Sequence, residues 1–199
     1  HLHYDDVLRS AERTLDKLDT DYLDLYLIHW PNPAISLRET LLAFSKLYES
    51  GKIKNIGVSN FNEYQLRVAR KITKVPISVN QVEFHPWYRQ QKLLKYCKKN
   101  NLVLTASAPL ARTKVLQDPL VNELAVKYGK TPAQIVLRWQ ISLGVVTIPR
   151  SSSKEHIEDN FEILSFELED SDIDRINDIS KEEKVYRIDM DDEIYGIPD

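Results

Sequence analysis

The sequence is poor in glycine and cysteine, and each shortage excludes a class of protein. Only five of its 199 residues are glycine, and none of them forms the GxGxxG pattern that follows a strand in Rossmann dinucleotide-binding domains. The one cysteine, Cys97, cannot form an internal disulfide, and no Cys/His spacing predicts a zinc site. We therefore expect no bound metal and a reducing compartment, the cytoplasm.

The sequence also lacks long apolar runs and a strong excess of one charge. No run approaches the roughly 18 apolar residues that span a bilayer, so we expect no membrane partner. A net charge of −3 gives no electrostatic case for nucleic acid as a partner. The first residue is not methionine, so a targeting signal would lie outside this sequence. Because no linker or shift in composition interrupts the chain, we predict a single domain over residues 1–199.

Short apolar runs alternate with amphipathic stretches along the whole chain. The predicted strands are 23–29, 53–60, 77–84, 102–108 and 145–149. The predicted helices are 7–18, 36–51, 63–71, one through residues 93–97, 119–128, 131–144, one that begins at about 153, and 170–179. Capping boxes are expected at Ser36 with Glu39 and at Thr131 with Gln134.

This alternation implies an α/β fold with parallel strands joined by right-handed crossovers, in an open sheet or a closed barrel. Because the Rossmann pattern is absent, we favour the (β/α)8 TIM barrel. Five strands cannot close such a barrel and would leave both sheet edges unpaired. We therefore interpret the chain as the C-terminal portion of a larger barrel. A polypeptide that began at His1 is expected to be unstable and inactive alone.

Polar residues gather where each predicted strand ends. The run "LDLYLIHWP" places His29 at a strand end, because Pro31 cannot continue a central strand. The other four strands end near Ser59, Gln81, Ser107 and Arg150. Since the C-terminal ends of parallel strands carry the chemistry of α/β folds, these residues predict a functional site. Glu83 is expected to have no partner for acid–base work, and His85 is expected to be structural.

Four motifs, in this order, carry a resemblance to a known family: "LIHWP", "IKNIGVSNF", "VNQVEFHP" and "IPRSSSKEHIEDN". Together they resemble the aldo-keto reductase family, up to about residue 180. The resemblance implies a barrel that binds a nicotinamide cofactor and transfers hydride to an aldehyde or ketone. A tyrosine donates the proton, aided by a lysine and an aspartate, and a histidine helps to hold the developing oxyanion. The tyrosine, lysine and aspartate would precede His1.

The resemblance assigns roles to residues at the first strand ends. His29 matches the catalytic histidine, whose N–H can donate to the substrate oxygen. Ser59, Asn60 and Gln81 match the residues that hydrogen-bond the nicotinamide carboxamide. Ser107 stands where most members have a tyrosine stacked on the nicotinamide, and a serine cannot stack.

Later residues match the phosphate side of the cofactor site. Leu110 and Arg112 lie on the loop that closes over the pyrophosphate in the family. Arg150, Ser151 and Ser152 precede a helix whose N-terminal N–H groups favour an anion, here the adenosine-side phosphate.

The last assignments concern the adenine, the choice of cofactor and the substrate. Asp159 and Asn160 are expected near the adenine. His156 stands where many NADP-binding members have arginine, so we expect weakened NADP binding and use of either NADP or NAD, with a tilt towards NAD as the pH rises. Trp30 and Trp87 follow strand ends and are expected to line the substrate pocket.

Two classes of function remain open. The full-length protein is expected to be an NAD(P)H-dependent reductase of small aldehydes or ketones, acting reversibly on alcohols. The alternative is a nicotinamide-binding module on the same fold, with an interaction or redox-sensing role and little turnover. His29 favours the enzyme, and a metal-dependent hydrolase is disfavoured because the strand ends offer no clustered ligands. The sequence does not indicate an oligomeric state.

Overall fold

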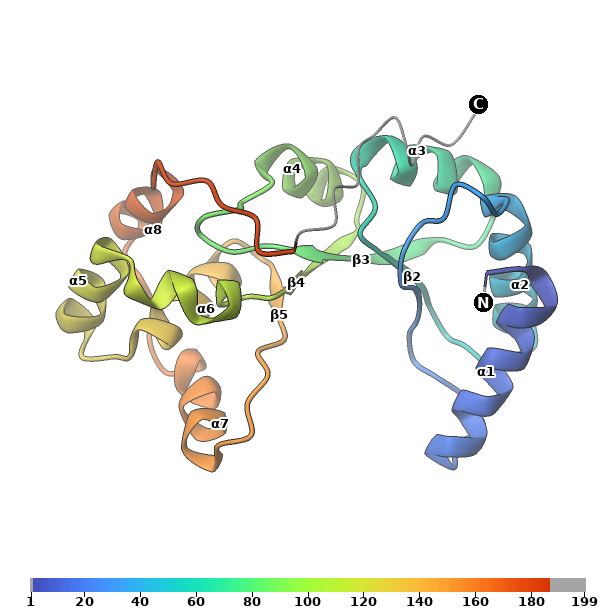
Figure 1. Ribbon diagram of the computed structural model, residues 1–199, viewed down its shortest axis with the longest axis horizontal. Coiled ribbons are helices and arrows are strands. Elements are labelled where there is room, and N and C mark those ends of the chain that lie inside the picture. The colour runs from blue at the N-terminus through green and yellow to red at the C-terminus, as the bar shows by residue number, and fades with distance from the viewer. Residues whose placement is uncertain (1, 187–199) are drawn as a thin grey trace. The chain divides into compact units, whose positions relative to one another are not determined.

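The computed structural model describes residues 2–186, in which strands and helices alternate (Figure 1). The strand order is β1-β2-β3-β4-β5. The pairs β1/β2, β2/β3 and β4/β5 are parallel. The predicted parallel α/β class is therefore confirmed. Contacts divide the described residues into two compact units, unit 1 (2–81 and 95–103) and unit 2 (82–94 and 104–186), and the single-domain assignment stays a prediction.

Unit 1 holds the first three strands and the helices between them. Its elements are α1 (Tyr4–Leu18), β1 (Tyr26–Ile28), α2 (Leu37–Glu49), β2 (Ile56–Ser59) and α3 (Glu63–Ile72). Three elements have residues in both units: β3 (Ile77–Glu83), α4 (Gln91–Lys99) and β4 (Val103–Ser107). Helices α1 and α2 lie side by side in unit 1 (Figure 1). No helix in the described part of the chain has the length and apolar character needed to cross a membrane.

Strand β2 is fully buried, and β1 approaches it closely at Gly57. Gly57 pairs with Leu27 of β1, and a Cβ added at Gly57 would collide with the Leu27 side chain. The neighbouring Ile56 and Val58 are completely buried, so the close approach lies inside the core of unit 1. The sequence pattern "NIGVSN" thus combines apolar packing with the close approach of β1.

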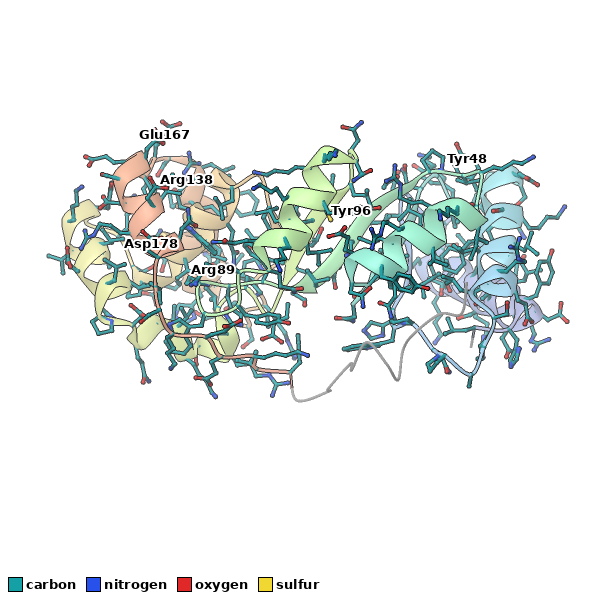
Figure 2. All side chains as sticks on the ribbon, turned by 90° about the horizontal axis from the view of Figure 1, so that it is seen from above. Tyr48, Arg89, Tyr96, Arg138, Glu167 and Asp178 are labelled. Atoms are coloured by element: carbon teal, nitrogen blue, oxygen red, sulfur yellow. The ribbon has the colours of Figure 1, made fainter. Side chains whose placement is uncertain are left out.

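Unit 2 contains two strands and a helical layer. Its elements are β4 (Val103–Ser107), the 3₁₀ helix η1 (Ala111–Gln117), α5 (Pro119–Tyr128), α6 (Pro132–Ser142), β5 (Val146–Thr147), α7 (Lys154–Phe161), the 3₁₀ helix η2 (Glu162–Leu164) and α8 (Asp170–Asn177). The Trp139 ring stacks on Phe84 with 5.5 Å between centroids, and its indole N–H donates to Asn177. Arg138 and Glu167, both labelled in Figure 2, form an ion pair at 3.5 Å.

Helix capping agrees with the prediction at one helix and differs at another. Thr131 and Gln134 form the expected capping box of α6. Ser36 precedes α2, but its side chain caps nothing, so the capping box predicted there is wrong. The reason is that the Glu39 carboxylate instead accepts a hydrogen bond from the Tyr4 N–H at 2.9 Å. Glu39 therefore stabilises the N-terminus of α1 rather than that of its own helix.

Several apolar positions are more exposed than the helical pattern predicts. Leu18 and Tyr48 have the spacing of the apolar faces of the helices predicted over 7–18 and 36–51, yet they are 61% and 41% exposed. Both lie in the last turn of a helix, and in α2 the buried position is Leu47. The strands are also shorter than predicted, and β5 keeps only Val146 and Thr147.

Candidate active site

The C-terminal ends of β1, β2 and β3 bring four predicted residues together in unit 1. The backbone N–H of Asn60 donates to the Gln81 carbonyl at 2.9 Å. The Asn60 side chain donates from Nδ2 to the His29 carbonyl at 3.0 Å. The Ser59 hydroxyl donates to the Gln81 carbonyl at 2.8 Å. Asn60 therefore joins the ends of three strands. Because β1, β2 and β3 pair in parallel, these ends lie next to one another along one edge of the sheet.

These hydrogen bonds decide which polar atoms are left for a ligand. The two N–H groups of Asn60 Nδ2 serve the His29 carbonyl and Ser59 Oγ, at 3.0 and 3.1 Å. Asn60 Oδ1 is therefore the atom left to accept a hydrogen bond. The half-buried Gln81 uses its backbone carbonyl for the cluster, so its side-chain amide can both donate and accept. Together they complement a primary carboxamide, which has one acceptor oxygen and two N–H donors.

His29 lies directly after β1 and is exposed to solvent. Its ring lies 6.1 Å from that of Trp30, at a tilt of 49°. Trp30 is half-buried, so one aromatic face flanks the imidazole. A ring N–H in this position can donate to a ligand at the strand ends. The sequence placed His29 correctly, because Pro31 ends the strand.

In unit 2, Ser107 ends β4, which pairs in parallel with β5. The segment that leads from β5 to Arg150 therefore leaves the same edge as Ser107. The loop after Ser107, on which Leu110 and Arg112 were expected, contains η1. Four non-glycine residues there have left-handed backbone φ angles: Ala108 at 45°, Ala111 at 49°, Arg112 at 53° and Thr113 at 71°. Leu110 is half-buried and the Arg112 side chain is exposed.

One supporting residue of this loop escaped the sequence prediction. Gln140 is completely buried on α6 and donates from Nε2 to the carbonyls of Phe84 and Pro109, at 3.0 and 2.9 Å. It thereby ties the end of β3 to the start of the loop. The signal that could have revealed Gln140 is its place next to Trp139, in the helix predicted over 131–144. A glutamine among buried apolar residues must find hydrogen-bond partners for its amide.

The segment from Arg150 to α7 forms the other predicted part of unit 2. The Ser153 hydroxyl accepts from the His156 N–H at 3.4 Å, so Ser153 caps α7, which begins where the helix was predicted. Ser151 Oγ accepts from the Ser153 N–H at 3.1 Å. Arg150 and His156 are exposed, so charged and polar groups surround the N-terminus of an eight-residue helix. Ser152 is also exposed, while Asp159 and Asn160 are half-buried further along α7.

Trp87 packs more tightly than expected for a pocket residue. It is 5% exposed, and its indole N–H donates to Asp118 at 2.8 Å. The Lys181 ammonium lies 3.3 Å from the centre of its ring. Glu83, which was expected to have no partner, is paired with His85 Nε2 at 3.0 Å. Both side chains are buried, so this carboxylate is part of a buried polar cluster.

In the part of the chain that the structure describes, no group of three or more histidine, cysteine or acidic side chains could hold a metal ion.

Comparison with known proteins agrees with this geometry. Residues 1–181 match the model of the aldo/keto reductase family. The chain is 42% identical over 182 residues to glyoxal reductase of Bacillus subtilis, which covers 92% of this chain and 66% of that protein. It is 38% identical over 185 residues to 9,11-endoperoxide prostaglandin H2 reductase of Trypanosoma cruzi, covering 92% and 65%. The chain thus spans just under two thirds of the length of these curated relatives.

Solved structures give the same result. A thermostable aldo-keto reductase, crystallised with the inhibitor epalrestat, superposes with a TM-score of 0.86 at 40% identity, over 89% of this chain and 67% of that one. Aldose reductase from Schistosoma japonicum gives a TM-score of 0.88 at 30% identity, over 94% and 68%. These likenesses confirm the predicted (β/α)8 fold class. With the family match over most of its length, the chain belongs to the aldo/keto reductase family.

Proposed function

We propose that the full-length protein containing this chain reduces small aldehydes or ketones with NADPH or NADH. The observation that carries the proposal is the cluster of His29, Ser59, Asn60 and Gln81 at the strand ends of unit 1. Two relatives are named for reductase activity, one of them on glyoxal, a small dicarbonyl compound. A small carbonyl compound is therefore the proposed substrate class.

The residues of unit 1 fit the nicotinamide end of such a cofactor. Asn60 Oδ1 would accept from the carboxamide nitrogen, while Gln81, with Ser59 beside it, supplies further polar groups. This binding fixes which face of the ring is presented. When bound, the cofactor supplies the hydride. The His29 N–H donates to the carbonyl oxygen as negative charge develops there, which lowers the barrier more than it strengthens ground-state binding.

The residues of unit 2 fit the phosphate end. Arg150, Ser151 and Ser152 at the N-terminus of α7 would hold the adenosine-side phosphate, with Asp159 and Asn160 towards the adenine. Leu110 and Arg112 would cover the pyrophosphate, and Ser107 would leave the nicotinamide without a stacked ring. His156 is exposed and stands where an arginine would pair with the 2′-phosphate of NADP, so use of both NADP and NAD is proposed. The proposed location of the protein is the cytoplasm.

The decisive experiment measures cofactor binding and carbonyl reduction by the full-length protein and by His29→Ala. Loss of one donor to a developing oxyanion lowers kcat by about 10²- to 10³-fold, so the variant should bind NADPH normally and turn over slowly. His3→Ala removes another exposed histidine, which pairs with Glu39, and serves as the control. Tight NADPH binding without reduction of any aldehyde or ketone by the parent would instead favour the non-catalytic module.

A further inference from the structure

The segment of residues 181–186, called here the strap, is fixed to unit 2 through its backbone. The N–H groups of Val185 and Tyr186 donate to the Glu83 carboxylate at 2.6 and 2.9 Å. The Glu183 N–H donates to the Trp87 carbonyl at 2.9 Å. Backbone hydrogen bonds at two points, one of them to an ionised side chain, hold the strap against the residues that follow β3.

Glu83 is built as an anchor for these N–H groups. It is 3% exposed, and Oε1 accepts from His85 Nε2 as well as from Val185. Burial alone would raise the pKa of Glu83, but the hydrogen bonds from His85, Val185 and Tyr186 outweigh it and hold the pKa below its ordinary value. Both carboxylate oxygens therefore have donors, and the buried charge is satisfied.

Side chains of the strap reach the loop that follows β4. The Arg112 guanidinium lies 5.3 Å from the centre of the Tyr186 ring. Lys114 Nζ pairs with the Glu183 carboxylate at 2.6 Å. Both contacts fall within residues 108–114, the loop proposed to cover the pyrophosphate. The strap is therefore connected to Glu83 on one side and to this loop on the other.

The loop needs such support because its backbone is strained. Ala108, Ala111, Arg112 and Thr113 all have left-handed φ angles, which are unfavourable for non-glycine residues and persist only where neighbouring contacts enforce them. Gln140 holds the loop at the Pro109 carbonyl. Arg112 and Lys114, at the other end, contact the strap.

We propose that Glu83 is a positioning residue for cofactor binding. Its carboxylate docks the strap, and the docked strap holds residues 108–114 in the conformation that retains the cofactor. Glu83 touches no cofactor itself, and the inference rests on the proposed function, because it assumes that Arg112 faces the pyrophosphate. Docking should slow cofactor release, since contacts that order the loop reduce its freedom to move away from the cofactor.

The test uses Glu83→Gln in the full-length protein. A glutamine has the same size, but its Nε2 group would meet a backbone N–H donor, so one anchoring hydrogen bond is lost. Hydrogen exchange of peptides from residues 108–114 and 181–186 should become faster. NADPH release, followed by stopped-flow fluorescence, should become about five-fold faster or more. Glu182→Gln removes the same charge from an exposed strap position and should change neither measurement.

A second variant keeps the proposal testable if Glu83→Gln does not fold. Tyr186→Leu leaves Glu83 and His85 intact and removes the ring beside Arg112, so NADPH release should become about two- to five-fold faster. The proposal is overturned if Glu83→Gln leaves exchange of the strap unchanged. It is also overturned if Glu83→Gln speeds hydrogen exchange of the strap but not NADPH release, or if Tyr186→Leu, which lacks the ring beside Arg112, releases NADPH at the parent's rate. A parent that binds no nicotinamide cofactor refutes the proposed function instead, while hydrogen exchange still reports docking.

Discussion

Asn60 offers the sharpest test of the unit 1 cluster, because its backbone and its side chain have separable roles. Its φ of 63° lies in the left-handed region, which asparagine tolerates better than most residues. Its side chain joins the end of β2 to the His29 carbonyl and to Ser59. Replacement by alanine disturbs both features, whereas replacement by glycine removes the side chain and leaves the backbone unstrained.

The structure sets the expected magnitudes. Two hydrogen bonds from Nδ2, each worth about 0.5–1.5 kcal/mol net, should lower the free energy of unfolding by about 1–3 kcal/mol in Asn60→Gly. Asn60→Ala should be less stable by about a further 1 kcal/mol, the cost of a Cβ at positive φ. Both variants lose Oδ1, so both should bind NADPH about ten-fold more weakly.

Denaturant unfolding and cofactor titration of the full-length protein measure these quantities. Asn55 provides a matched control, because it lies before β2 and its amide donates to the Asp24 carbonyl at 3.0 Å. Asn55→Ala should lose stability but bind NADPH like the parent. If Asn60→Gly and Asn60→Ala bind NADPH as tightly as the parent does, Asn60 is a structural cap and the assignment of the carboxamide site is refuted.

Three further predictions follow from single residues. His156→Arg should lower the dissociation constant of NADP by about ten-fold or more and leave that of NAD unchanged, since an exposed guanidinium can pair with the 2′-phosphate. An unchanged dissociation constant for NADP would show that this residue does not set cofactor choice. Burial raises the pKa of the Cys97 thiol from 9.0 to about 11, so a thiol reagent at pH 8 should modify Cys97 only after the protein unfolds. Rapid labelling of the native protein would contradict the burial of Cys97. The pKa of Glu83 is held below its ordinary value of 4.5, so the ionised carboxylate stabilises the folded protein fully above that pH and loses this effect as the pH falls through the lowered pKa. The difference in unfolding free energy between the parent and Glu83→Gln should therefore shrink between pH 6 and 3. A constant difference would count against the reasoning.

The elements could be predicted because their signals are local. Alternation of apolar runs with amphipathic stretches located each strand and each α-helix but neither 3₁₀ helix, and Pro31 marked the end of β1. Parallel pairing then implied that residues after successive strands meet at one edge, which placed Ser59 and Asn60 beside Gln81. Period and strand direction thus placed these residues at one edge, whereas the roles expected of them rest on the resemblance to the aldo-keto reductase family.

The errors occurred where a residue's partner lies outside its own element. Glu39 has the spacing of a capping box with Ser36, but the N-terminus of α1 offers it a backbone donor instead. The pattern of apolar residues also predicted burial wrongly at Leu18 and Tyr48, which are exposed. The last turn of a helix can extend beyond the elements against which the helix packs. The left-handed residues of the 108–113 loop carried no signal, since alanine, arginine and threonine do not favour positive φ.

The expectation that Glu83 has no partner is wrong, and most of its partners lie far away in the sequence. It lies between Val82 and Phe84 at the end of a buried strand, where an ionised carboxylate is expensive unless it is hydrogen-bonded. That argument alone predicts a donor, and His85, two residues away, is the obvious choice. The other donors are backbone N–H groups about a hundred residues later, and an N–H looks the same at every position of a sequence. Only the fold could identify Val185 and Tyr186, and it is their attachment that makes Glu83 relevant to the loop beside Arg112.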